Sequence, residues 1–123
     1  MLPQTVSEAW DNREGPVVMT TVSPSRVPNA IYATCVKKLD DQKIAVADNY
    51  FKKTRKNIED GSRASILFIT KEKKSYQVKG PIEYVTEGEV YEDMKGWVDP
   101  KHPRVAVAVI HVEEVYNGQT KLL

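Results

Sequence analysis

The sequence predicts a mainly β protein, a β-barrel with small helices. Three observations lead to this fold class. Six or seven short segments rich in β-branched and apolar residues are separated by turn residues. The segments with helical composition are few and short. The most apolar segment, Arg104–Val112, is nearly continuous, which is typical of a strand that protein covers on both faces. Such a set of elements favours a compact barrel over a doubly wound sheet.

Length and composition predict one globular domain over residues 1–123. Hydrophobic residues make up 41% and charged residues 28%, which is ordinary globular composition. No apolar run approaches the roughly 20 residues that span a bilayer. The N-terminus has neither the basic start nor the apolar core of a signal peptide. We therefore expect a cytoplasmic protein that does not enter a membrane.

Three short helices are expected. The first reaches Asp11, and Thr5 or Ser7 can cap its start. The second covers Lys53–Asp60 and ends at a glycine, which readily adopts the left-handed conformation that closes a helix. The third covers Glu89–Val98, because its apolar residues are spaced to share one face.

The expected strands are separated by residues that favour turns. Asp40–Asp41 is expected to join two strands in a hairpin. Gly80–Pro81 is expected to produce a bend or a bulge between two others. In chain order, the expected strands are Val17–Val22, Ala30–Leu39, Lys43–Asp48, Ala64–Thr70, Tyr76–Lys79, Ile82–Thr86 and Arg104–Val112.

The chain has one cysteine and two histidines, which is too few for a structural metal site. Cys35 cannot form an internal disulfide, and with His102 and His111 it does not make a ligand set at finger or ribbon spacing. Cys35 lies in an apolar strand pattern, so we expect a buried structural thiol and not a nucleophile. We expect no bound metal.

The stretch Asp48–Ile58, DNYFKKTRKNI, concentrates positive charge in a chain whose net charge is +1. It leaves a strand and enters a helix, so free backbone N–H groups and the helix dipole favour an anion there. Lys53 supplies a full charge, and Thr54 supplies a hydroxyl that can donate to a phosphate oxygen. The alternative is a solvated helix face whose cations pair with nearby acids such as Glu59 and Asp60. Composition leaves both interpretations open.

A nucleic-acid-binding module is the competing interpretation from another class of protein. The letters KKTRK resemble the basic clusters that contact phosphate backbones. A duplex footprint needs about six or more phosphate contacts. Elsewhere in this chain basic residues are interleaved with acids, as at Glu113–Glu114. A single phosphate therefore suits the basic stretch better than a polymer, and we expect no nucleic acid partner.

One string of residues carries a specific resemblance. Ala47–Ile58 follows the pattern A-D-N-x-x-x-K-T-x-x-N-I. With it, the sequence resembles the FMN-binding proteins of the pyridoxamine 5′-phosphate oxidase-like superfamily, in particular the small single-domain FMN-binding group. The other stretches that match this family are Met1–Pro3, Pro28–Ala30, Ile44–Asn49, Tyr76–Gly80 and Val109–Tyr116.

The resemblance implies a split β-barrel that forms a homodimer, with FMN at two sites along the dimer interface. Lys53 and Thr54 match the pair that holds the FMN phosphate in the family. Tyr32 and Thr34, two residues apart on the opposing strand, would point to one face and could line the other side of the ring. The residues that match the strand end bordering the isoalloxazine ring are Ala47, Asp48, Asn49 and Tyr50.

The cofactor that this resemblance implies is FMN and not FAD, because one phosphate site is visible and no dinucleotide fingerprint is present. The implied function is redox chemistry or electron transfer, with a partner protein or NAD(P)H exchanging electrons. The alternative is an FMN-dependent oxidoreductase, such as a flavin reductase or a small-molecule oxidase. The sequence offers no clear catalytic acid or base for it. His102 and Arg104 lie at or just before the start of the last strand and could approach the flavin from there. We expect them instead to be solvent-exposed loop residues.

Two features bear on oligomeric state and substrate. We expect that one small barrel cannot bury both apolar faces of Arg104–Val112. A second copy of the chain, related by a two-fold axis, is therefore expected to cover the rest. Leu122–Leu123 could reach the flavin bound to the other subunit, although terminal residues of this kind are more often frayed. The segment Asn117–Leu123 shows no counterpart of the segment that grips pyridoxal phosphate in the full oxidase. The resemblance therefore supports flavin binding in this chain more strongly than it supports a role in vitamin metabolism.

Overall fold

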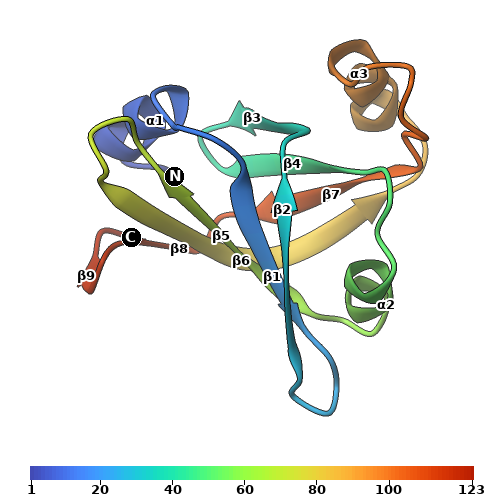
Figure 1. Cartoon of the computed structure of the whole chain (residues 1–123), viewed down its shortest axis with the longest axis horizontal. Coiled ribbons are helices and arrows are strands. Elements are labelled where there is room, and N and C mark those ends of the chain that lie inside the picture. The colour runs from blue at the N-terminus through green and yellow to red at the C-terminus, as the bar shows by residue number, and fades with distance from the viewer.

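The computed structural model describes residues 1–123, and its strands form a curled half-barrel with three short helices around it (Figure 1). The strand order is β2-β1-β5-β6-β7-β4-β3, and β8 pairs with β6 and with β9. This confirms the predicted mainly β split-barrel fold. The elements are α1 (Gln4–Asp11), β1 (Val17–Val22), β2 (Pro28–Ala33), β3 (Val36–Asp40), β4 (Lys43–Asp48), α2 (Lys53–Glu59), β5 (Arg63–Ile69), β6 (Ser75–Val85), α3 (Glu89–Trp97), β7 (Ala106–His111), β8 (Glu114–Asn117) and β9 (Thr120–Lys121).

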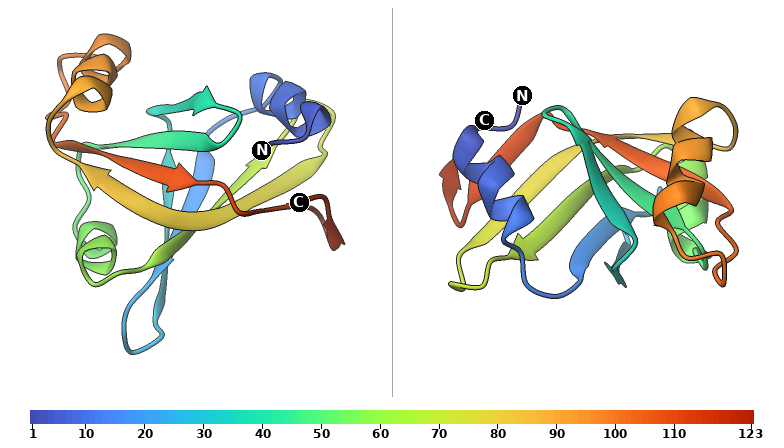
Figure 2. Two further views of the ribbon diagram at one scale, coloured as in Figure 1. Left: turned by 180° about the vertical axis from the view of Figure 1, so that it is seen from behind. Right: turned by 90° about the horizontal axis from the view of Figure 1, so that it is seen from above.

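The interior of the half-barrel holds the larger of two hydrophobic clusters. Alternate residues of the strands point inward, as the burial pattern of β1 and β5 shows. Helix α1 adds Val6 and Trp10 to this cluster, and the Trp10 ring meets Phe68 edge to face at 5.1 Å between centroids. Helix α2 adds Ile58. The two helices lie at different ends of the half-barrel, as both views of Figure 2 show.

Strand β7 is buried along almost its whole length. Residues Ala106–Ile110 are all buried, because one face of β7 looks into the barrel interior and the other lies under α3. Met94 and Val98 supply much of that outer cover. The prediction that protein covers both faces is confirmed. The expectation that one chain leaves part of this apolar run uncovered is wrong for Ala106–Ile110, whose outer face α3 covers within the same chain. Val105, just before the strand, is exposed.

The strand expected over Ala30–Leu39 is two strands. Strand β2 ends at Ala33 and pairs with β1, whereas β3 begins at Val36 and pairs with β4. Between them the chain crosses from one side of the split barrel to the other. The backbone carbonyl of Cys35 accepts a hydrogen bond from the Ala47 N–H at 2.9 Å, which fixes this crossing against β4.

The expected bend at Gly80–Pro81 lies within one continuous strand, β6. Here β6 changes partners: its first part pairs with β5 and β8, and from Ile82 it pairs with β7. A Cβ atom on Gly80 would lie 1.8 Å from the backbone oxygen of His111. Glycine is therefore required at this corner because another backbone approaches too closely for a side chain.

Both ends of the chain differ from the sequence expectations. The first helix begins at Gln4 after Pro3, without a side-chain cap, so the predicted capping by Thr5 or Ser7 is wrong. The strands β8 and β9 were not expected. Leu123 exchanges backbone hydrogen bonds with Val115, so the C-terminus is paired and not frayed. The longest helix has nine residues, too short to cross a bilayer.

Candidate functional site

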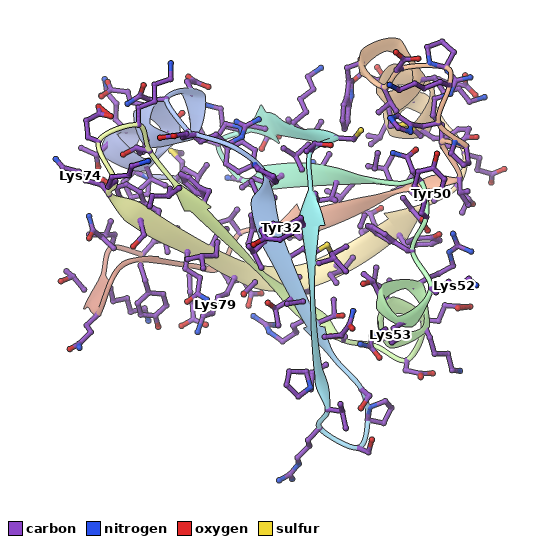
Figure 3. All side chains as sticks on the ribbon, in the orientation of Figure 1. Tyr32, Tyr50, Lys52, Lys53, Lys74 and Lys79 are labelled. Carbon is purple, nitrogen blue, oxygen red and sulfur yellow. The ribbon has the colours of Figure 1, made fainter.

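An open cleft lies between β2 and the segment that leads from β4 into α2. Figure 3 labels Tyr32 on β2, and Tyr50, Lys52 and Lys53 on that segment. The volume of the cleft is about 380 Å³, within the range of about 300–1,000 Å³ that is usual for small-molecule sites. The residues that line it are Asn29, Ile31, Tyr32, Ala33, Thr34, Cys35, Ala47, Asn49, Tyr50, Phe51, Lys52, Lys53, Thr54 and His102.

Seven of the eight residues predicted to contact a cofactor lie on the wall of this cleft: Tyr32, Thr34, Ala47, Asn49, Tyr50, Lys53 and Thr54. The eighth, Asp48, is fully buried behind the wall. Tyr32 stands at the outer border of the cleft, where 79% of it is exposed. The structure thus brings together side chains that are up to 22 positions apart, from Tyr32 to Thr54, on two sides of one cavity.

The cleft wall carries positive charge and no negative charge. Neither Asp nor Glu lines it, although the chain has 17 acidic residues. Lys52 and Lys53 are exposed on the wall, and neither forms an ion pair. Only Lys56 pairs as a solvated helix face would, with Asp60 at 3.3 Å. Lys52 and Lys53 thus do not make the pairs with Glu59 or Asp60 that the solvated-face interpretation expects.

Thr54 is held so that its hydroxyl hydrogen is available. Its Oγ1 accepts a hydrogen bond from Asn29 Nδ2 at 3.2 Å, and Thr54 makes no other side-chain hydrogen bond. The hydroxyl can therefore donate toward the cleft that Thr54 lines. Asn29 was not predicted as a site residue. The sequence signal for it is the stretch Pro28–Ala30, one of those that match the FMN-binding family.

Buried hydrogen bonds fix helix α2 against the barrel. Asn57 Nδ2 donates to Thr21 Oγ1 at 3.0 Å, and both side chains are buried. The N-cap residue Lys52 makes no side-chain capping bond to this helix. The first backbone N–H groups of a helix have no partner within it. The cleft therefore borders unpaired backbone donors as well as two lysines.

The Asp48 carboxylate organises the segment that follows β4. Phe51 N–H donates to its Oδ1 at 3.0 Å, and Arg55 binds both carboxylate oxygens, with Nε to Oδ2 at 2.8 Å and Nη2 to Oδ1 at 3.0 Å. The Tyr84 hydroxyl also donates to Oδ2. The buried charge is thus compensated by one cation and by hydrogen bonds from three residues.

This network raises the pKa values of the two side chains, Tyr84 and Arg55, that donate to Asp48. Burial, and then the hydrogen bond to Asp48, raise the pKa of Tyr84 to about 12. The hydrogen bond to Asp48 likewise raises the pKa of Arg55 above its usual value. The hydrogen bond raises both pKa values for the same reason, because the Asp48 carboxylate stabilises the protonated form of each donor.

The loop before β7 is attached to the same segment by three consecutive residues. The Asp48 backbone oxygen accepts from Val105 N–H at 2.9 Å, and Asn49 Oδ1 accepts from Arg104 N–H at 3.0 Å. The Tyr50 hydroxyl lies 3.3 Å from His102 Nδ1. His102 is consequently half-buried on the cleft wall, and Arg104 is half-buried behind it. The expectation that these two residues are exposed loop residues is wrong.

Cys35 also differs from its expected environment. It is half-buried, with no disulfide, and it lines the cleft beside Thr34. The expectation of a buried core thiol depended on an unbroken strand at this point. The crossing between β2 and β3 instead brings Cys35 to the wall.

Comparison with known proteins gives one family. The model of the family described as "Pyridoxamine 5′-phosphate oxidase" matches residues 4–118. The crystal structure of HupZ from Group A Streptococcus is 30% identical, with a TM-score of 0.83 over 98% of this chain and 97% of that one. The uncharacterized protein MJ0282 of Methanocaldococcus jannaschii is 32% identical over 82% of this chain and 71% of its own length.

A more distant structure shares the fold. An FMN-binding protein from Syntrophomonas wolfei is 17% identical, with a TM-score of 0.77 over 89% of this chain and 80% of that one. At this level of identity the similarity shows that the two chains fold alike.

The Asp48–Tyr84 hydrogen bond predicts a stability difference that depends on pH. The pKa of Tyr84 is about 12 in the folded chain against 10.0 ordinarily. The stabilisation is therefore complete below about pH 10 and is lost as the pH rises toward 12. Tyr84→Phe should lower the free energy of unfolding by about 1–2 kcal/mol below pH 10, and by less as the pH approaches 12. Urea unfolding at several pH values measures this difference.

Tyr32→Phe is the matched control, because the Tyr32 side chain is exposed and its hydroxyl makes no hydrogen bond in the structure. It should leave the free energy of unfolding unchanged at neutral pH. A Tyr84→Phe difference that stays constant up to pH 12 would show that neither burial nor the Asp48 hydrogen bond raises the pKa of Tyr84.

Proposed function

Because the chain belongs to the pyridoxamine 5′-phosphate oxidase family, we propose that it is a flavoprotein that binds FMN non-covalently in the cleft between β2 and α2. The observation that carries this proposal is the charge of the cleft. Its wall holds two unpaired lysines and no acidic residue. A wall of this kind favours an anionic ligand in a chain that is close to neutral overall.

The phosphate of FMN fits the end of the cleft at the start of α2. Lys53 offers an ammonium group there, and Thr54 offers a hydroxyl hydrogen that Asn29 leaves free. Hydrogen bonds from charged donors to phosphate oxygens are among the stronger ones in proteins. We assign the phosphate contacts to Lys53 and Thr54, with Asn29 positioning the Thr54 hydroxyl.

The ring of FMN fits the apolar part of the same wall. Ile31 and Ala33 on β2 lie opposite Ala47 at the end of β4, and all three line the cleft. Asn49 Oδ1 is occupied by Arg104 N–H, so the amide nitrogen of Asn49 is the atom left to donate to the ring edge. The pairing of an apolar slot with one oriented donor is usual for cofactor sites.

FMN, when bound, supplies electron transfer in one- or two-electron steps. The chain's own residues bind and orient the flavin and set the charge around it. The proposed role is redox or electron transfer, with NAD(P)H or a partner protein as the electron source. An FMN-dependent oxidoreductase, such as a flavin reductase or a small-molecule oxidase, is the second candidate. It is favoured by His102, an ionisable group that the structure brings to the cleft wall.

The phosphate assignment predicts a difference between two ligands. Lys53→Ala should weaken FMN binding by about 1–3 kcal/mol, because a charged partner of the phosphate is lost. Riboflavin lacks the phosphate, so its affinity should change far less. Fluorescence titration of the apo-protein with each flavin measures both dissociation constants.

Lys56→Ala is the matched control for Lys53→Ala. Lys56 lies on the same helix, is exposed, and pairs with Asp60 outside the cleft. It should leave both affinities unchanged. Equal losses for FMN and riboflavin in Lys53→Ala would place Lys53 away from the phosphate.

We also propose that the chain forms a homodimer through the outer face of β2, β1 and β5. Tyr32, Val18 and Leu67 are direct neighbours across these strands, and 79% of Tyr32 and 42% of Leu67 are exposed. Tyr32 also borders the cleft, so a partner on this face would cover the open side of the flavin site. Ligand that contacts both chains stabilises the dimer by mass action.

Sedimentation of the apo and FMN-loaded protein over a dilution series tests this dimer. FMN should lower the concentration at which the dimer dissociates. A monomer that keeps its flavin at every concentration would contradict a site shared between chains.

A further inference from the structure

Two hydrogen bonds join helix α3 to the cleft wall through the backbone of one residue, Arg104. The Tyr91 hydroxyl, on α3, donates to the Arg104 backbone oxygen at 3.2 Å. The Arg104 N–H donates to Asn49 Oδ1 at 3.0 Å. Asn49 lines the cleft, whereas Tyr91 and Arg104 do not. The loop after α3 thus lies beside the end of β4, as Figures 1 and 2 show, and α3 contacts the cleft indirectly.

The bond from Arg104 determines which end of the Asn49 amide faces the cleft. A backbone N–H can only donate, so the side-chain oxygen of Asn49 is the atom that must face it. The Asn49 NH2 group makes no hydrogen bond within the chain and is left for the cleft. Without the bond from Arg104, the amide can turn over and present its oxygen, which is an acceptor. Arg104 therefore decides whether this part of the wall offers a donor.

Arg104 occupies its position at an energetic cost. Its backbone is left-handed, with φ 51°, a conformation that is uncommon for a residue with a side chain. Its Nε is buried and has no hydrogen-bond partner. Its Nη1 donates only to the backbone oxygen of Lys95, at 3.3 Å. A strained backbone and an unpaired buried donor both lower stability. Such features persist where a functional arrangement requires them.

Helix α3 is a rigid support for Arg104. Met94 is fully buried on the outer face of β7, and Tyr91 packs against the same apolar cluster. On the other side, Val105 N–H donates to the backbone oxygen of Asp48 at 2.9 Å, one residue before Asn49. Arg104 is thus held between a packed helix and the end of a buried strand, so its N–H points in a fixed direction.

We propose that Tyr91 and Arg104 are positioning residues for the flavin ring, because together they hold the Asn49 NH2 group toward the cleft. The proposal rests on the proposed FMN function and deepens it, since neither residue touches the cleft. Tyr91 fixes the Arg104 backbone, and Arg104 fixes the Asn49 amide. A fixed donor at the ring edge stabilises the electron-rich reduced ring more than the oxidised ring. Tyr91 and Arg104 therefore also raise the reduction potential of the bound flavin.

Tyr91→Phe tests this role, because it removes the hydroxyl and keeps the ring that packs on β7. It should weaken the binding of FMN and of riboflavin by the same factor, about two- to tenfold, since the ordering of one hydrogen bond is lost. It should also lower the reduction potential of bound FMN. Fluorescence titration of the apo-protein measures the two affinities, and reductive titration against a reference dye measures the potential.

A double-mutant cycle with Asn49→Ala separates positioning from a merely structural role. In the Asn49→Ala background, Tyr91→Phe should cause no further loss of affinity and no further change of potential, because it acts through Asn49. Equal losses in both backgrounds, or no loss in either, would contradict the proposal. Tyr116→Phe is the matched control, since it removes a hydroxyl that bonds to Glu114 on β8, outside the cleft. It should match wild type in every measurement.

Two substitutions of Arg104 test its backbone independently of its side chain. Arg104→Asn and Arg104→Val both remove the guanidinium, but asparagine tolerates a left-handed backbone and a β-branched valine does not. Arg104→Asn should bind both flavins as wild type does, whereas Arg104→Val should bind both more weakly. Equal affinities in the two variants would show that the Arg104 backbone does not position Asn49, and the flavin site would stand. If wild type itself fails to bind FMN, the proposed function is wrong.

Discussion

The candidate site depends on one buried carboxylate. Asp48 is fully buried at the end of β4, and its oxygens accept hydrogen bonds from the backbone of Phe51, from Arg55 on α2 and from Tyr84 on β6. A buried charge is costly unless it is paired and fully hydrogen-bonded, and here it is both. The same few bonds join a strand end, a helix and a second strand. They therefore fix the wall of the cleft without occupying any of it.

The Asp48 network accounts for one of the four cations in the stretch Lys52–Lys56. Its four cations divide into three sets. Arg55 turns inward to Asp48, and Lys56 pairs with Asp60 on the solvent side. Lys52 and Lys53 remain unpaired on the cleft wall. Arg55 suits the inward position because a guanidinium can bind both oxygens of a carboxylate, which a lysine cannot.

Features determined locally could be predicted from the sequence. The apolar run of β7 predicted a strand covered on both faces. The A-D-N-x-x-x-K-T-x-x-N-I string predicted the family and, together with Tyr32 and Thr34, half of the 14 residues that line the cleft. The break at Thr34–Cys35 could not be predicted, because it depends on β2 and β3 pairing with different strands. The sequence allowed His102 either to approach the site or to be solvent-exposed, and it could not decide between the two for a similar reason. The position of His102 depends on bonds from residues 48–50 to a loop more than 50 positions away.

The most direct test of the flavin assignment is reconstitution of the purified chain with excess FMN, followed by removal of free ligand by gel filtration. We expect a yellow protein with one FMN per chain, and weaker retention of riboflavin, since the phosphate adds charged hydrogen bonds. Absorbance at the flavin maximum against protein concentration gives the stoichiometry. A protein that emerges colourless after this treatment would contradict the account.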